Sequence, residues 1–184
     1  MVFNCLIAGV GGQGTVLASK LLAAAAMKSG FDVRTTETIG MAQRGGSVVS
    51  HVRIGDGVFS PLIPHGRADL LIGFDPAEAV RQLQFLSGNG TLITCDGAAE
   101  MMEFIRNNIP GATIIPSQKI KAKYAKMLNV AMLGAAAQIG GLPFDADALL
   151  AAVSEMPRFR EENMESFELG RKLYLEQSMQ GGEK

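Results

Sequence analysis

Hydrophobic positions along the chain form short apolar runs that alternate with longer segments of helical periodicity. The short runs are rich in Val, Ile, Leu and Thr, which favours β-strands, and Gly, Pro or Asp often bounds them. The predicted strands cover residues 2–7, 31–38, 48–54, 68–74, 90–95 and 112–115. The predicted helices cover residues 15–26, 76–86, 98–107, 119–138, 145–156 and 161–177. Because strands alternate with helices, the pattern predicts an α/β fold built on a layered sheet.

One extended run carries a hairpin signal. Residues 48–54 alternate, and Gly55-Asp56-Gly57 separates them from a second extended stretch at 58–60. An Asp-Gly pair between two extended stretches is typical of a β-hairpin turn. The same G-D-G occurs in thiamine diphosphate enzymes, but the paired asparagines that should follow it come far too late here, at Asn107-Asn108. We therefore interpret residues 55–57 as a turn and expect an antiparallel portion, which makes the predicted sheet mixed.

A glycine-rich turn joins the first predicted strand to the first predicted helix. Gly9, Gly11 and Gly14 match the spacing G-x-G-x-x-G in the strand–turn–helix context that this fingerprint requires. Such glycines allow a tight turn, a close approach of a phosphate or another backbone, and close packing of the helix. The start of the helix also offers unpaired N–H groups to an anion. Gly9, Gly11, Gly12, Gln13 and Gly14 are therefore candidate cofactor-binding residues, although the same glycines could serve only a close loop against a partner protein.

A nucleotide ligand would require an acidic residue about 20 positions further on, to bind the ribose. Glu37, at the end of the next predicted strand, is the candidate for this role. Asp32 lies at the start of that strand and therefore at the wrong end.

A second glycine-rich loop covers residues 39–47 and carries one strong cation, Arg44. Arg44 together with the amides of Gly45, Gly46 and Ser47 could bind a phosphate or a carboxylate. Alternatively, Arg44 pairs with an acid or a carbonyl and holds the loop against another subunit. His51, which lies in the next predicted strand, is interpreted as structural, because catalysis would need a positioned partner.

Composition narrows the choice of function. The chain has 184 residues, enough for one domain with its own core, and 47% of them are hydrophobic. A net charge of −1 gives no general attraction to nucleic acid or to an anionic membrane surface. We see no apolar run long enough for a membrane span and no signal peptide, so we expect a cytoplasmic protein without membrane or nucleic-acid partners.

The two cysteines are far apart, and each lies in a predicted strand. Cys5 and Cys95 are therefore expected to be buried thiols in a reducing compartment. Two cysteines cannot hold an iron–sulfur cluster, which normally takes four, and the histidines show no zinc-binding spacing. We predict no metal site in this chain.

Four stretches together resemble the gamma domain of the 2-oxoacid:ferredoxin oxidoreductases. These stretches are residues 9–14, residues 43–47 followed by 51–54, residues 68–75, and residues 162–167. The variant at residues 38–47, TIGMAQRGGS, is most similar to the small (beta) subunits of indolepyruvate ferredoxin oxidoreductase. The resemblance covers nearly the whole chain. It implies one gamma-type domain over residues 1–184, a three-layer Rossmann-like fold with a mostly parallel, mixed sheet and a helical C-terminal part.

The resemblance also implies a role in a complex. The complete enzyme oxidatively decarboxylates an aryl-2-oxoacid such as indolepyruvate, transfers the acyl group to coenzyme A and passes two electrons to ferredoxin. Thiamine diphosphate, magnesium and the iron–sulfur clusters belong to the large (alpha) catalytic subunit in this family. This chain would then be a subunit that is inactive alone. Its glycine loop and the Arg44 loop would face the partner subunit or a phosphate of coenzyme A.

Two other functions remain open from the sequence. One is a stand-alone NAD-dependent oxidoreductase, which the glycine spacing and Glu37 favour, although the chain offers no substrate domain and no credible proton-transfer group. The other is a non-catalytic nucleotide-binding or assembly module.

Overall fold

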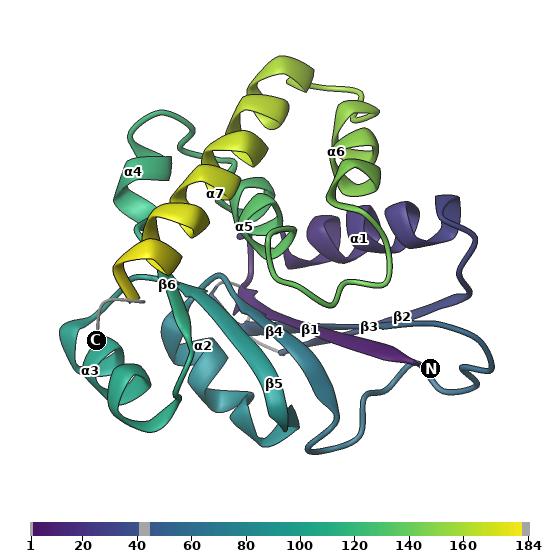
Figure 1. Cartoon of the computed structure of the whole chain (residues 1–184), viewed down its shortest axis with the longest axis horizontal. Coiled ribbons are helices and arrows are strands. Elements are labelled where there is room, and N and C mark those ends of the chain that lie inside the picture. The colour runs from purple at the N-terminus through teal and green to yellow at the C-terminus, as the bar shows by residue number, and fades with distance from the viewer. Residues whose placement is uncertain (1, 41–44, 182–184) are drawn as a thin grey trace.

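The computed structural model describes residues 2–40 and 45–181, which contain a six-stranded sheet in the order β2-β3-β1-β4-β5-β6 (Figure 1). The strands are β1 (Phe3–Val10), β2 (Val33–Ile39), β3 (Ser47–Ile54), β4 (Ala68–Gly73), β5 (Leu86–Cys95) and β6 (Thr113–Ile115). β1, β4, β5 and β6 pair in parallel, whereas β3 is antiparallel to both β1 and β2. Of the described strands, β3 alone runs against the others, which confirms a mostly parallel, mixed sheet.

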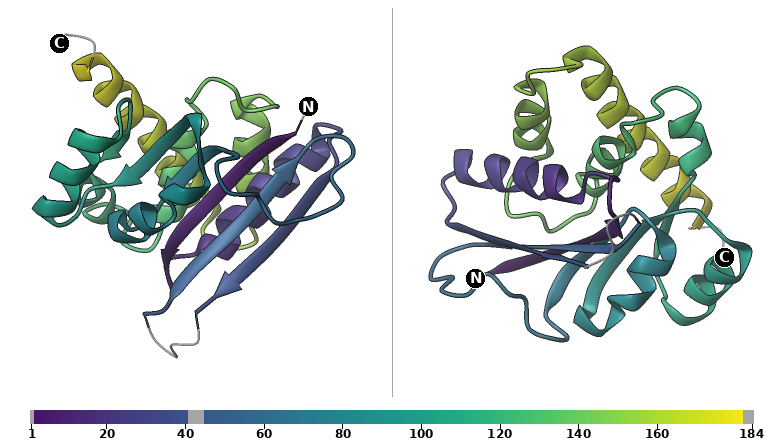
Figure 2. Two further views of the ribbon diagram at one scale, coloured as in Figure 1. Left: turned by 90° about the horizontal axis from the view of Figure 1, so that it is seen from below. Right: turned by 180° about the vertical axis from the view of Figure 1, so that it is seen from behind.

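Helices cover both faces of the sheet, so the molecule has the predicted three layers (Figures 1 and 2). The larger layer contains α1 (Thr15–Lys28), α4 (Ser117–Lys121), α5 (Leu128–Ala136), α6 (Ala146–Ser154) and α7 (Arg160–Gly181). The smaller layer contains α2 (Pro76–Arg81), the 3-10 helix η1 (Leu83–Phe85) and α3 (Ala99–Asn108). Side chains alternate between the two cores along β1: Cys5 and Ile7 pack under the larger layer, and Leu6 and Ala8 under the smaller one.

The centre of the larger layer is α5, all nine residues of which are buried. A helix that is apolar on every side must be surrounded by other elements. It crosses α7 at very close range. A Cβ atom added at Gly134 would lie 2.0 Å from the Phe167 carbonyl oxygen, and one added at Gly170 would lie 1.8 Å from the Ala131 carbonyl oxygen. The two helices can approach this closely because glycine stands at both crossing positions.

The antiparallel hairpin lies elsewhere than predicted. It joins β2 to β3, whereas residues 58–60 form no strand. Gly55-Asp56-Gly57 does form a turn, with positive φ at Gly55 and Gly57. The physical reason is that β3 already pairs with β2 on one edge and with β1 on the other, so no edge is left for residues 58–60. The carbonyl of Ser60 instead accepts a hydrogen bond of 2.8 Å from the Arg53 side chain.

The prediction of a single helix at residues 119–138 is also wrong. The structure has two helices, α4 and α5, with a linker at residues 122–127 that α7 holds in place. The hydroxyl of Ser166 donates to the Met127 carbonyl (3.0 Å), and the hydroxyl of the buried Tyr124 donates to the Glu165 carboxylate. These tertiary contacts override the helical propensity of the linker. The helix predicted at 76–86 likewise ends early, at Arg81, and η1 follows it.

No helix in the described part of the chain is both long enough and apolar enough to cross a lipid bilayer.

The close crossing of α5 and α7 gives a testable prediction. Gly134→Ala should lower the free energy of unfolding by about 1–3 kcal/mol, because the added methyl group forces the two backbones apart. Gly140→Ala is the matched control, since a Cβ atom there would meet no atom within 4 Å. Chemical denaturation of both variants checks the prediction, and equal stability of the two would contradict it.

Candidate functional site

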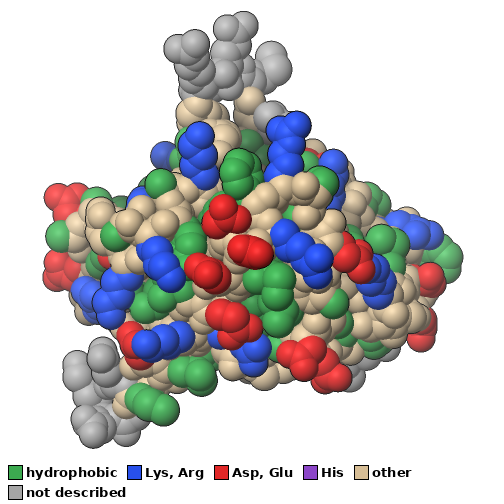
Figure 3. Space-filling model, turned by 90° about the horizontal axis from the view of Figure 1, so that it is seen from above, with side chains coloured by type: hydrophobic (Ala, Val, Ile, Leu, Met, Phe, Trp, Pro, Cys, Tyr) green, Lys and Arg blue, Asp and Glu red, His purple; other side chains and the backbone are tan. Residues whose placement is uncertain are grey.

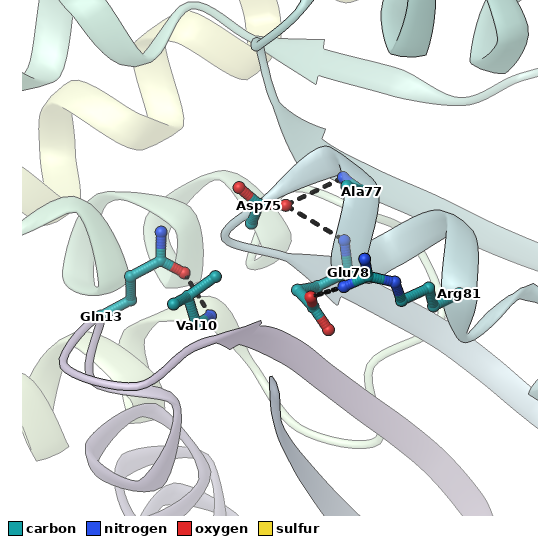
Figure 4. Close-up of polar contacts among 6 residues, drawn as sticks. All are labelled: Val10, Gln13, Asp75, Ala77, Glu78 and Arg81. Carbon is teal, nitrogen blue, oxygen red and sulfur yellow. Dashed lines mark hydrogen bonds and ion pairs between the residues drawn. The ribbon is translucent and has the colours of Figure 1, made fainter. Parts of the chain in front are cut away.

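The candidate site lies at the carboxyl ends of β1 and β4, where the chain changes its direction across the sheet. After β1 the chain builds β3 and β2 on one side, and it then crosses to β4 on the other. Such a switch point opens a crevice in which open α/β sheets bind their ligands. Here the glycine loop after β1 and the turn at Asp75 after β4 flank the switch point as its two walls (Figure 4), and we call the region between them the crevice. The Phe74 amide, which donates to the Ala8 carbonyl at 2.8 Å, ties the two walls together.

Gly9 and Gly14 have structural roles in the glycine loop. A Cβ atom at Gly9 would lie 2.7 Å from Gln13 Oε1 and 3.2 Å from the Phe74 side chain. Gly14 has φ of 82°, and a Cβ atom there would lie 2.3 Å from the amide nitrogen of Asn129. Gly14 was expected to let the helix pack on the strand, but its close neighbour is Asn129 of α5. Sequence spacing could not reveal this contact, because Asn129 is more than 100 residues away.

Gly11 and Gly12 differ from the other two glycines because space remains around them. The Gly11 amide donates to the Gly46 carbonyl at 2.8 Å, so the backbone that approaches Gly11 is the second glycine-rich loop. Gly12 is exposed, has φ of 94°, and a Cβ atom there would meet nothing within 4 Å. Gln13 closes the turn, since its Oε1 accepts from the Val10 amide at 2.7 Å (Figure 4). The outer surface of the loop is therefore open at Gly12.

The second glycine-rich loop lies beside the first. Gly45 has φ of 74°, Gly46 contacts Gly11 as described, and Ser47 opens β3. The Ser47 carbonyl accepts from the Gly40 amide at 2.8 Å, which closes the base of the hairpin. Arg44 lies outside the described residues, so its proposed contact with an anion stays a prediction. The structure thus brings together two of the loops that sequence analysis selected separately.

The opposite wall contains Glu78, an acidic residue that sequence analysis missed. Asp75 caps α2 by accepting from the amides of Ala77 (2.9 Å) and Glu78 (3.1 Å). The Glu78 side chain is buried, with only 5% of it exposed, and one of its oxygens pairs with Arg81 (Figure 4). The other oxygen, Oε2, has no hydrogen-bond partner among the described residues. The capping-box spacing of Asp75 and Glu78, with Pro76 between them, is a signal that could have identified this wall.

Glu37 is not placed for a ribose. In a dinucleotide-binding fold, the strand after the first helix lies next to the first strand. Here β3 lies between β1 and β2, so the candidate acid is displaced by one strand from the crevice. Its carboxylate instead accepts from the Ser19 hydroxyl of α1 at 3.3 Å.

The two thiols and His51 are buried. Burial, together with the nearby Asp96, raises the pKa of the Cys95 thiol to about 12. Burial, helped by Asp69, also raises the pKa of Cys5 far above its ordinary range. Nδ1 of His51 accepts from the Ile63 amide at 3.2 Å, and burial lowers the pKa of this histidine. His51 therefore holds the segment after β3, as its structural interpretation predicted.

The described residues contain no group of three or more His, Cys, Asp or Glu side chains that could hold a metal ion.

Two substitutions separate the glycines of the first loop. Gly14→Ala should lower the free energy of unfolding by about 1–2 kcal/mol, because alanine is strained at a positive φ and its Cβ atom would crowd the Asn129 side chain. Gly11→Ala should cost less than about 1 kcal/mol, because the backbone of Gly11 lies outside the left-handed region and the nearest atom to its added Cβ, Gly46 O, is 3.6 Å away. Denaturant unfolding of the two variants measures the difference. Equal losses would mean that neither the positive φ at Gly14 nor its contact with Asn129 limits the loop.

The buried thiols predict how stability changes with pH. Their folded pKa values lie above the value of 9.0 for a free thiol, so the folded protein holds both protons longer than the unfolded chain does. This contribution to the free energy of unfolding is complete below about pH 8.5 and decreases as pH rises further. We expect wild type to lose more stability than Cys95→Ala between pH 7.5 and pH 10. Identical losses would contradict the prediction, and rapid alkylation of the folded protein at pH 8 would show that the thiols are not buried.

Both the sequence and the fold of this chain are similar to those of known proteins. Residues 4–173 match the model of the pyruvate ferredoxin/flavodoxin oxidoreductase family. Indolepyruvate oxidoreductase subunit IorB of Archaeoglobus fulgidus is 36% identical, across 92% of this chain and 94% of its own length. The same subunit of Pyrococcus horikoshii is 32% identical, across 91% and 94%. The gamma subunit of keto/oxoacid ferredoxin oxidoreductase from Geobacter sulfurreducens superposes with a TM-score of 0.72 at 25% identity, across 95% of this chain and 99% of that one. The chain belongs to the pyruvate ferredoxin/flavodoxin oxidoreductase family, and it has the fold of the gamma subunits.

Proposed function

We propose that this chain is the small subunit of a thiamine-diphosphate-dependent 2-oxoacid:ferredoxin oxidoreductase that acts on indolepyruvate or another aryl-2-oxoacid. One observation carries the proposal: four relatives named as indolepyruvate oxidoreductase subunit IorB match at 32–36% identity, across at least 94% of their own lengths. A gamma subunit shared by pyruvate and ketoisovalerate oxidoreductases matches a smaller share, 30% identical across 74% of its length. The aryl substrate is therefore the better-supported choice.

We assign the thiamine diphosphate, its magnesium and the iron–sulfur clusters to the large subunit. A cluster takes four thiolates in most proteins, and this chain has two cysteines. Both are free and buried in the core, one in β1 and one in β5, with pKa values that favour the protonated thiol. This chain would complete the complex, and the large subunit would carry the redox chemistry and pass electrons to ferredoxin.

The crevice between the glycine loop and Asp75 is the proposed place of contact with coenzyme A or with the large subunit. The start of α1 presents backbone amides there, and amides at a helix start suit a phosphate. Open space over Gly12 leaves room for a diphosphate to approach the backbone. The residues proposed for this contact are Gly9, Gly11, Gly12, Gln13, Gly14, Arg44, Gly45, Gly46 and Ser47. Coenzyme A, when bound, would supply the thiol that accepts the acyl group, and this chain would hold its phosphates.

A stand-alone NAD-dependent enzyme has less support. β3 occupies the position next to β1 that a dinucleotide-binding fold gives to its second strand, and Glu37 bonds to Ser19. An assembly module without a small ligand differs from our proposal only in what fills the crevice.

Reconstitution tests the proposed function. The purified chain alone should not oxidise indolepyruvate with coenzyme A and ferredoxin, and it should not reduce NAD with any 2-oxoacid. Addition of the large subunit should restore coenzyme-A-dependent reduction of ferredoxin. The large subunit without this chain is the control. NAD reduction that scales with the concentration of this chain alone would favour a dehydrogenase.

A further inference from the structure

The turn between α6 and α7 holds an aromatic side chain in a strained and exposed position. Phe159 has φ of 54°, and it is the one non-glycine residue with positive φ in the described ranges. A bulky side chain rarely adopts this conformation, because its Cβ crowds the backbone. The ring is 65% exposed, so burial offsets little of the strain. A residue whose backbone strain is not offset by burial is a candidate for a role in binding.

A buried asparagine fixes this turn. The backbone amide of Asn163 donates to the Phe159 carbonyl at 2.8 Å, and its side-chain amide donates to the Arg158 carbonyl at 3.0 Å. Only 3% of Asn163 is exposed, so water does not compete strongly for these bonds. Both neighbouring carbonyls are therefore held, and the side chains of Arg158 and Phe159 are presented outward.

Phe159 lies at the edge of a groove of about 750 Å³. The groove runs between the α6–α7 turn, the linker before α5 and the first turn of α1. Its lining is mainly apolar, with Met127, Val130 and Met156 among its residues, and Leu17 of α1, 38% exposed, lies at its other side. Asn129 lines the same groove and also contacts Gly14. The groove thus begins directly beside the glycine loop.

One segment of α7 holds both walls of the groove. Asn163 fixes the α6–α7 turn, and Ser166 donates to the Met127 carbonyl of the opposite wall at 3.0 Å. Glu165 accepts from the Tyr124 hydroxyl and pairs with Lys123 at 3.5 Å. These three residues belong to the stretch 162–167 that sequence analysis used for the family resemblance. Their contacts show that the stretch shapes the groove.

The groove has a small excess of positive charge. Lys126 and Arg158 line it together with one acid, Glu162, whereas the third lining cation, Lys123, pairs with Glu165 at 3.5 Å. Within the described part of the chain, no carboxylate lies within 4.0 Å of Lys126 or Arg158 in an ion pair. Figure 3 shows the face of the molecule over α6 and α7, where Lys and Arg side chains are mixed with Asp, Glu and exposed hydrophobic ones. An occupant with acidic groups and apolar side chains would match this surface.

We infer that this groove is the docking site for an acidic segment of the large subunit that carries an apolar anchor. Phe159 and Leu17 would contact the anchor, and Arg158 with Lys126 would attract the acidic groups. An exposed aromatic ring beside an arginine at the edge of an apolar groove is typical of the residues that dominate protein–protein binding. Because Asn129 lines the groove and contacts Gly14, a large subunit docked here would lie beside the glycine loop. The inference rests on the proposed function, because it takes the large subunit as the partner.

Phe159→Asn separates docking from folding. Asparagine tolerates the left-handed conformation better than phenylalanine, so the thermal unfolding midpoint should stay the same or rise. The affinity of the full-length chain for the purified large subunit should fall about tenfold or more, because the ring is lost. Phe59→Asn is the matched control: it removes a ring that is 95% exposed in the segment after β3, away from the groove.

Arg158→Gln tests the charge of the groove. Binding of the wild type should weaken as salt concentration rises, and the variant should bind more weakly at low salt with a smaller dependence on salt. Arg106→Gln, at an exposed position of α3 in the other helical layer, is the control. Wild-type affinity of both Phe159→Asn and Arg158→Gln would overturn the docking site while the subunit role stands. No binding of the wild-type chain to the large subunit would instead overturn the proposed function.

Discussion

The backbone contact between α5 and α7 is the constraint on which the functional surface depends. Gly134 and Gly170 allow the two helices to touch backbone to backbone, and this crossing fixes α5 in the middle of the larger layer. The first turn of α5 then carries Asn129 to Gly14, where it bounds the glycine loop. α7 in turn carries Ser166 to the linker before α5. The crevice and the groove are therefore positioned by the same pair of helices.

The antiparallel insertion of β3 explains why a nucleotide-like fingerprint need not imply a dinucleotide. The glycines of the first loop meet packing demands within this chain: Gly9 of β1 lies against Gln13 and Phe74, and Gly14 lies against Asn129 of α5. A dinucleotide also needs a second parallel strand beside the first, which would bring an acid to the ribose. β3 takes that place, and its hairpin loop contacts Gly11 through Gly46. Glu37 is therefore one strand away from the position that a ribose requires.

Sequence patterns predicted the features that local chemistry determines. The alternation of strands and helices and the burial of both cysteines follow from neighbouring residues, and the structure contains both features. The hairpin was misplaced because pairing depends on which strand edges are free, and that is a property of the whole sheet. The helix predicted at 119–138 was too long, because contacts from α7 hold the linker at residues 122–127 in a different conformation. Glu78 was missed although its capping-box spacing with Asp75 is a local signal, and Phe159 was missed because the sequence pattern does not reveal its positive φ.

The stretch 162–167 shows how a recognition motif can be converted into a physical role. Sequence resemblance identified it without saying what it does. In the structure, each polar side chain of Asn163, Glu165 and Ser166 points to a backbone or side chain in a wall of the groove, and Phe167 lies in the core against Gly134. A stretch needed only for packing would be expected to bury apolar side chains and to leave such loops free. Here a buried asparagine instead holds the turn that presents a strained and exposed phenylalanine, and this is the basis for proposing that a partner contacts that ring.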